Sequence, residues 1–274
     1  MGETRLEQAL RRDRAIVAAA LGVIAVLAWV YVLGLARGMD MGGMDMRGAR
    51  MISTGVRMAM APAAVPWSGL DFAMMFVMWA VMMIGMMTPS AAPLILLYAR
   101  VGRQAVSDGR PFAATGWFAG GYLSAWVLFA LAATVAQLVL ERAALLTPGM
   151  AAASDLFGAA VLIAAGLYQW SRLKDTCLVH CQSPLSFLQH HGGFRRDAAG
   201  SFGLGLSHGA YCLGCCWALM LLLFVGGVMN LAWIAGLSIL VLVEKLASRG
   251  RLVARAAGVA FIVAGLRLAA GVIA

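Results

Sequence analysis

The chain has 274 residues, of which 62% are hydrophobic and only 12% are charged, and its mean hydropathy is +0.87. A soluble domain has about 25% charged residues, so this composition excludes a water-soluble enzyme, a disordered chain, a coiled coil and a disulfide-rich secreted protein. The net charge of +9 does not indicate a nucleic-acid partner, because the basic residues lie between apolar runs. The composition predicts an all-α, polytopic transmembrane helical bundle with the lipid bilayer around it.

Seven apolar runs are long enough to cross the hydrocarbon core of a bilayer, which takes about 20 residues in a helix. In chain order they are Ala15–Ala36, Phe72–Ala99, Phe112–Leu140, Ser154–Trp170, Phe202–Val225, Met229–Leu246 and Ala256–Ala274. We divide the chain into an N-terminal tail with the first transmembrane helix (1–37), a Met-rich extracytoplasmic loop (38–70) and a six-helix membrane domain (71–274).

The basic residues are unequally divided between the two sides of this arrangement. With the N-terminus inside, fifteen of the 21 Lys and Arg residues lie on the inner side, five lie on the outer side, and Arg267 lies within the last run. Positive residues accumulate on the cytoplasmic side of membrane proteins. The distribution therefore predicts a cytoplasmic N-terminus and, with seven spans, an extracytoplasmic C-terminus.

The outer loop after the first span is rich in methionine. Its seven methionines are Met39, Met41, Met44, Met46, Met51, Met58 and Met60. Packing does not account for so many thioethers in a loop of Gly, Ala and Asp residues, and the clusters resemble the extracytoplasmic copper-gathering segments of copper transporters. Because thioether sulfur is a soft donor suited to Cu(I), we expect this loop to collect copper.

The second span has a stripe of methionines on one helical face. The stripe consists of Met75, Met78, Met82 and Met86, with Met83 and Met87 beside it. Neutral, soft donors in this order would let a monovalent soft cation pass through a bundle without buried fixed anions. The alternative is that methionine serves here as a flexible apolar filler of the core.

All five cysteines lie on the inner side or in the fifth span, and the outer loops have none. A disulfide framework would lie on the oxidising side of the membrane, so this distribution predicts reduced thiols. Reduced cysteine beside histidine is typical of a soft-metal site. The alternative for any single cysteine is that it is a small packing residue.

The spacing in the fifth span places a possible ligand set on one helix face. His208, Cys212 and Cys215 are separated by four and three residues, and Cys216 follows directly. His208 and Cys215 are about 10 Å apart along the helix axis, so one ion cannot bind both. Neighbouring pairs, such as His208 with Cys212 or Cys212 with Cys215, can chelate an ion.

A second motif, Cys177-Leu-Val-His180-Cys181, lies in the inner loop after the fourth span. This segment either folds into the mouth of the bundle and completes the site of the fifth span, or forms a shallow site of its own that passes ions inward. We favour the second arrangement. We interpret His190 and His191 as a solvated loop, and we expect Glu244 and Lys245 to pair with each other or to extend toward the membrane surface.

These motifs together resemble a bacterial family of predicted metal-binding, multi-pass integral membrane proteins that contain a domain of unknown function. The resemblance covers the chain from about residue 72 onward and is carried by Met-Trp-Ala-Val-Met-Met-Ile-Gly-Met-Met-Thr-Pro, by Leu173-Lys-Asp-Thr-Cys-Leu-Val-His-Cys and by His208-Gly-Ala-Tyr-Cys-Leu-Gly-Cys-Cys-Trp. It implies a bacterial inner (plasma) membrane location and a metal role for His208, Cys212, Cys215, Cys216, Cys177, His180 and Cys181.

We therefore expect an inner-membrane protein that binds a soft metal and transports or delivers it, with Cu(I) as the metal and zinc as the alternative. Its partner would be a copper chaperone or a copper enzyme. The sequence has no catalytic constellation and no Walker-type phosphate loop, so we do not expect an enzyme. Two other readings are a structural or assembly subunit with packing cysteines, and a membrane thiol-redox protein that uses Cys212–Cys216.

Overall fold

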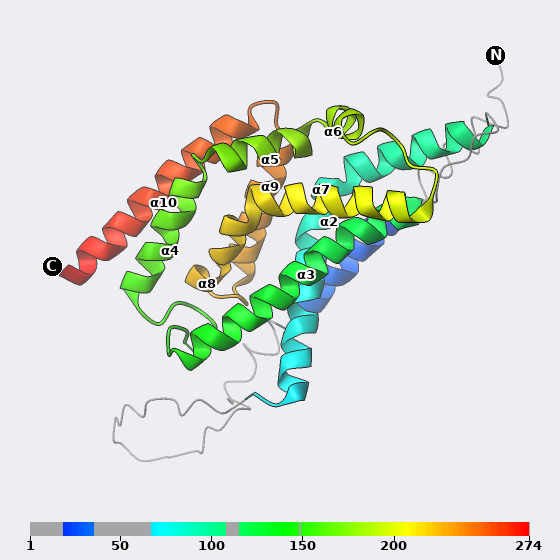
Figure 1. Cartoon of the computed structure of the whole chain (residues 1–274). Helices are drawn as coiled ribbons and strands as arrows, with labels where there is room; N and C mark the ends of the chain where they lie inside the picture. Colours follow the sequence, from blue (N-terminus) through cyan, green and yellow to red (C-terminus); the bar gives the residue numbers. More distant parts are fainter. Residues whose placement is uncertain (1–18, 36–66, 108–114, 148, 274) are drawn as a thin grey trace.

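The computed structural model describes residues 19–35, 67–107, 115–147 and 149–273, and within these residues the secondary structure is helical (Figure 1). A first, unlabelled helix covers Ala19–Leu35. The others are α2 (Gly69–Ser107), α3 (Thr115–Arg142), α4 (Asp155–Tyr168), α5 (Arg172–Gln182), α6 (Pro184–His190), α7 (Ala198–Leu221), α8 (Leu223–Gly226), α9 (Leu231–Leu246) and α10 (Gly250–Ile273). The predicted all-α class is confirmed. The Met-rich loop lies, up to residue 66, outside the described residues.

The number of helices able to cross a membrane is smaller than the sequence predicts. Among the described residues, four segments are long and apolar enough, namely Gly69–Gly102, Thr115–Arg142, Ala198–Gly226 and Gly250–Val272. The bent pair α4 and α5 raises the number to five if it forms one span. The helix Ala19–Leu35 and the 16-residue α9 are apolar but shorter.

The inner segment between the fourth and fifth predicted spans is helical rather than a loop. The chain bends by 64° between α4 and α5, and a new helix begins because the Ser171 hydroxyl accepts a hydrogen bond from the Lys174 amide at 3.1 Å. Pro184 stands at the first turn of α6, where its missing N–H costs nothing. Gly192 and Gly193, both with positive φ, follow the helix and reverse the chain toward α7.

Glycines let the long helices approach each other closely. A Cβ on Gly205 of α7 would overlap the Phe118 carbonyl oxygen of α3, and one on Gly121 of α3 would overlap the Phe202 carbonyl oxygen of α7. Both positions therefore require glycine, as is common where membrane helices pack. At the other end of the molecule α4 and α10 lie side by side (Figure 1).

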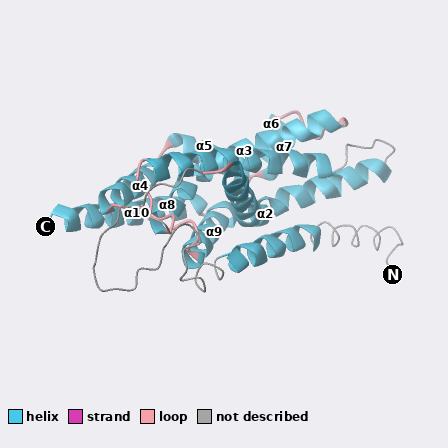
Figure 2. Ribbon diagram, turned by 90° about the horizontal axis from the view of Figure 1, so that it is seen from below, coloured by secondary structure: helices cyan, strands magenta, loops and turns pink. Residues whose placement is uncertain are grey.

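The methionine side of α2 faces the interior of the bundle. Trp79 on this helix is fully buried, and its Nε1 donates to Gln137 Oε1 of α3 at 2.7 Å. The first helix covers the same region of α2, since a Cβ on Gly85 would lie 2.8 Å from the Ala28 Cβ. Figure 2 shows the packed helices and the short connections between them. This packing places α2, α3 and α7 around one common core.

We predict that Gly205→Val destabilises the protein by at least about 1–3 kcal/mol, because the added side chain cannot fit against the α3 backbone. The measurement is the midpoint of thermal unfolding of the purified protein in detergent. Gly203→Val is the matched control on the same helix, because a Cβ there meets no atom of the described residues within 4 Å. Equal loss of stability in both variants would contradict the packing argument.

Candidate metal site

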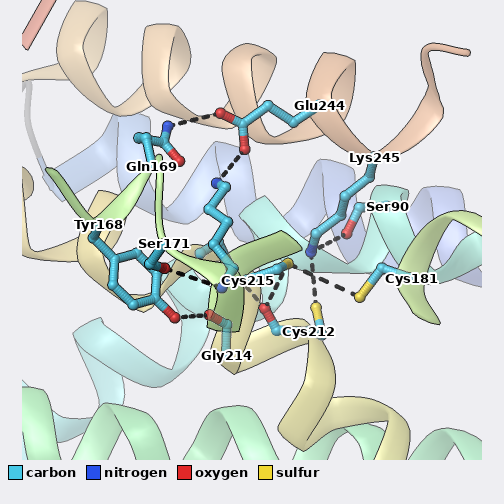
Figure 3. Close-up of polar contacts among 12 residues, drawn as sticks. Ser90, Tyr168, Gln169, Ser171, Cys181, Cys212, Gly214, Cys215, Glu244 and Lys245 are labelled. Carbon is cyan, nitrogen blue, oxygen red and sulfur yellow. Dashed lines mark hydrogen bonds and ion pairs between the residues drawn. The ribbon is translucent and has the colours of Figure 1, made fainter. Parts of the chain in front are cut away.

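Thiols from two helices meet where α5, α7 and α9 come together (Figure 3). The Cys181 Sγ of α5 lies 3.9 Å from the Cys215 Sγ of α7. The Cys212 Sγ, one turn earlier on α7, lies 3.2 Å from the Tyr122 hydroxyl of α3. Cys212, Cys215 and Cys216 are buried and Cys181 is half-buried. We call Cys181, Cys212, Cys215 and Cys216 the thiol cluster.

The helical period of α7 places its share of the thiol cluster on the inner face. His208, Cys212 and Cys215 are all at most 3% exposed, as their four- and three-residue spacing predicts. The Cys215 and Cys216 thiols both donate to the Cys212 carbonyl oxygen, at 3.0 and 2.9 Å. One backbone group therefore holds two neighbouring thiols close together.

A glycine on α7 allows α5 to pack against the thiols. A Cβ on Gly214 would lie 2.6 Å from the Cys177 Sγ, so Cys177 occupies the space that a side chain would take. The Gly214 carbonyl also accepts a hydrogen bond from the Tyr168 hydroxyl at the end of α4. Of the two arrangements that the sequence leaves open for this segment, the position of Cys181 fits the one in which the segment folds into the mouth of the bundle and completes the site of the fifth span. The bend between α4 and α5 folds this segment against α7, where Cys181 joins the thiols.

Lys245 of α9 extends into the thiol cluster. Its side chain is 5% exposed, and its Nζ donates to the Cys212 Sγ at 2.8 Å and to the Ser90 Oγ at 3.3 Å. The expected pairing with Glu244, or extension to the membrane surface, is wrong. Residues adjacent in a helix point in different directions, so Glu244 instead turns toward other partners.

Glu244 forms a second buried polar group beside the thiols (Figure 3). Its carboxylate accepts from the Lys174 Nζ of α5 at 2.6 Å and from the Gln169 Nε2 at 2.8 Å. Both members of the ion pair are at most 2% exposed. The interaction attaches α5 to α9 and so sets the position of the helix that supplies Cys181.

The two histidines of the predicted site lie in different places. His208 is buried between Phe187 and Tyr122, with ring centroids 5.0 and 5.7 Å away, and its Nδ1 has no hydrogen-bond partner among the residues that the structure describes. A buried nitrogen without a partner is rare and is expected where a ligand binds. The His180 Nδ1 instead lies 2.8 Å from the Thr176 carbonyl oxygen, and the His180 ring stacks on Tyr211.

The predicted methionine stripe lies inside the bundle. Met78, Met82 and Met86 are at most 4% exposed, and the half-buried Met75 accepts from the Gln137 amide at 3.8 Å. These contacts fit both packing and a soft-donor path. The end of the stripe adjoins the thiol cluster through one residue, because the Tyr122 hydroxyl that contacts Cys212 donates to the Met87 carbonyl at 3.1 Å.

Among the described residues, no three side chains of His, Cys, Asp or Glu stand together as a complete metal site. The closest approach to one is the pair Cys181–Cys215, with Cys212 and the Lys245 ammonium beside it. Sequence reasoning missed the parts played by Lys245, Tyr122 and Ser90. The only signal was a lysine inside an apolar helix.

The structure thus defines an all-helical, apolar protein with a thiol cluster buried among its helices. A comparison with known families matches residues 76–268 to the PpoB2 family, described as copper chaperones. The chain belongs to this family, which confirms a copper-related role. No curated protein and no solved structure matches the chain.

We predict that Glu244→Gln lowers the free energy of unfolding by about 3–5 kcal/mol, because it leaves the Lys174 ammonium buried without its counter-charge. Adding Lys174→Met should restore part of the loss. Asp175→Asn is the control, since the Arg255–Asp175 pair is exposed and such pairs contribute at most about 1 kcal/mol. Denaturant unfolding followed by tryptophan fluorescence measures all three, and an unchanged Glu244→Gln stability would contradict the role of the pair.

Proposed function

We propose that the protein is a membrane-embedded copper chaperone that holds Cu(I) in the thiol cluster. The observation that supports it is the 3.9 Å between the Cys181 and Cys215 sulfurs, which come from different helices. With metal–sulfur bonds of about 2.3 Å, two sulfurs on one ion lie about 3.8–4.0 Å apart in tetrahedral or trigonal geometry. The pair therefore has the spacing of two ligands of a single ion.

The charge around the cluster favours a monovalent ion. The Lys245 ammonium already provides one positive charge beside Cys212, and an adjacent cation stabilises the thiolate, the form of cysteine that binds metal. If Cu(I) enters and the ammonium turns toward Ser90, one monovalent cation replaces another beside the sulfurs. A zinc ion would add a further buried charge, which is costly in an apolar bundle. We therefore favour Cu(I) over zinc.

Two further donor groups lie near enough to take part. The His208 Nδ1, which has no hydrogen-bond partner among the described residues, is one helical turn before Cys212. It could bind an ion together with Cys212, but it is too far along α7 to share an ion with Cys215. The buried methionines of α2 would form the path by which Cu(I) reaches or leaves the thiols. Because the family is described as copper chaperones, we favour delivery to a copper protein over transport alone.

For the membrane arrangement we propose seven spans in a bacterial inner membrane. The four apolar helices and the α4–α5 pair would be joined by the helix Ala19–Leu35 and by α9. The distribution of Lys and Arg supports a cytoplasmic N-terminus. This orientation places the thiol cluster toward the cytoplasmic side, where thiols stay reduced.

We predict that Cys181→Ser and Cys215→Ser each weaken Cu(I) binding at least about tenfold, because each removes one sulfur of the pair. The measurement is competition with a chromogenic Cu(I) chelator, with the full-length protein in detergent under anaerobic, reducing conditions. Cys177→Ser is the matched control on α5 and should retain copper, since its sulfur packs on Gly214.

The same variants separate the alternatives. Cysteines that serve only packing would give serine variants with lower stability and unchanged copper binding. A thiol-redox role would give a Cys181–Cys215 disulfide that forms and is reduced reversibly, without copper dependence. Either result, or a wild-type protein that binds no copper, would overturn the proposed function.

We predict that reporter fusions after residues 110, 196 and 249 report a cytoplasmic location, and that fusions after residues 60, 147 and 227 report an extracytoplasmic one. The reason is that the first three sites lie on the predicted inner side, whose segments together contain fifteen of the 21 Lys and Arg residues, against five on the outer side. Paired fluorescent-protein and alkaline-phosphatase fusions make the measurement. A cytoplasmic signal from residue 227 would contradict the extracytoplasmic placement of the connection between the fifth and sixth predicted spans.

A further inference from the structure

Three histidines, one from the last turn of α5 and two from the C-terminal end of α6, gather outside the thiol cluster. The His180 and His190 ring centroids are 6.2 Å apart, with the planes at 67°. The Tyr211 ring of α7 stacks on His180 at 4.3 Å and meets His191 edge-on at 5.6 Å. His190 is exposed, and His180 and His191 are half-buried. This group therefore faces the surface, while the thiols face the core.

The hydrogen bonds of these rings select the nitrogen that is free to bind a metal. In each ring Nδ1 lies 2.7–2.8 Å from the carbonyl oxygen four residues earlier, which belongs to Thr176, Ser186 or Phe187. A carbonyl only accepts, so Nδ1 must carry the proton, and in the neutral ring the lone pair is on Nε2. Metal-binding histidines are commonly held in this way.

The separation of His180 and His190 suits one shared ion. With metal–nitrogen bonds of about 2.0 Å, and a ring centre about 1.1 Å behind the nitrogen, two imidazoles on one ion have centres about 5–6.3 Å apart, the larger value for a linear arrangement. The observed 6.2 Å is near the linear end of this range. An ion with only two protein ligands keeps open coordination positions, so such a site favours passing the ion on over storing it.

His191 differs from the other two in its surroundings. Its ring packs against Phe187 at 4.3 Å, and the Arg195 guanidinium donates to its carbonyl oxygen at 2.8 Å. A fixed positive charge beside a residue disfavours the approach of a metal cation. His191 is therefore the control: its imidazole lies in the same group of histidines, but we do not expect it to bind copper.

We propose that His180 and His190 form a second, solvent-facing copper site, from which Cu(I) passes to the thiol cluster through Cys181. Cys181 follows His180 directly on α5, and its sulfur is already 3.9 Å from Cys215. The step is a ligand exchange in which copper–nitrogen bonds break as copper–sulfur bonds form. Copper stays Cu(I), no electron moves, and the thiol proton leaves to water. The destination of the ion rests on the proposed function, whereas the imidazole site itself does not.

The test uses the full-length protein with all four residues of the thiol cluster, Cys181, Cys212, Cys215 and Cys216, changed to serine, so that the cluster is removed. We expect this variant to bind one Cu(I) with nitrogen ligands, as seen by X-ray absorption. Adding His180→Asn and His190→Asn should lower that affinity at least about tenfold. Adding His191→Asn instead should leave it unchanged. Equal effects of the His180/His190 and His191 changes, or no binding by the serine variant, would overturn the proposal.

A second measurement uses the protein with all its cysteines. His180→Asn with His190→Asn should leave the sulfur-bound copper at equilibrium intact, but should slow its loading from a Cu(I)–chelator complex in stopped-flow experiments. Unchanged loading rates would overturn the transfer role. If the serine variant binds no copper and the histidine substitutions have no effect, the imidazole site is excluded and the proposed function is retained. If the serine variant keeps copper on the imidazoles, and removal of the thiols does not weaken copper binding by the protein, the proposed function is overturned and the imidazole site is retained.

Discussion

Buried positive charge is the constraint on which the centre of this protein depends. Lys174 and Lys245 are enclosed by apolar helices, where an unpaired charge is very costly. Glu244 satisfies the first and the Cys212 sulfur lies against the second. Because Glu244 and Lys245 are neighbours on α9, one turn of that helix attaches both α5 and α7. The two pairings thereby bring the Cys181 helix against the α7 thiols.

Small residues make the same arrangement sterically possible. Gly214 leaves room for α5 beside the thiols. Gly205 lets α3 and α7 approach so closely that their backbones are in contact. That approach places the Tyr122 hydroxyl between Cys212 and the Met87 carbonyl. Soft donors, a tyrosine and an ammonium therefore share a compact interior. The Tyr122 hydroxyl, the Lys245 ammonium and the Cys212 sulfur contact one another or neighbouring oxygens, as polar groups in an apolar surrounding require.

The sequence predicted the helical class well and the limits of individual spans less well. Composition and run length identify α2, α3, α7 and α10 because each is apolar over more than a membrane thickness. The inner segment was misread as a loop, since α5 interleaves Arg, Lys, Asp and His with its few apolar residues and so lacks an apolar run. Only the Ser171 cap and its partner amide reveal that a helix begins there after a 64° bend.

Within one helix, the sequence alone determined which donors share a face, because the 3.6-residue period relates His208, Cys212 and Cys215 without knowledge of any neighbour. The chemical nature of those donors also pointed to copper, in agreement with the family. Tertiary structure alone decided that Cys181 meets Cys215 while His180 turns outward. Contacts between helices depend on bends, on glycine positions and on buried ion pairs between residues far apart in the chain. The helical period of a single segment does not predict them.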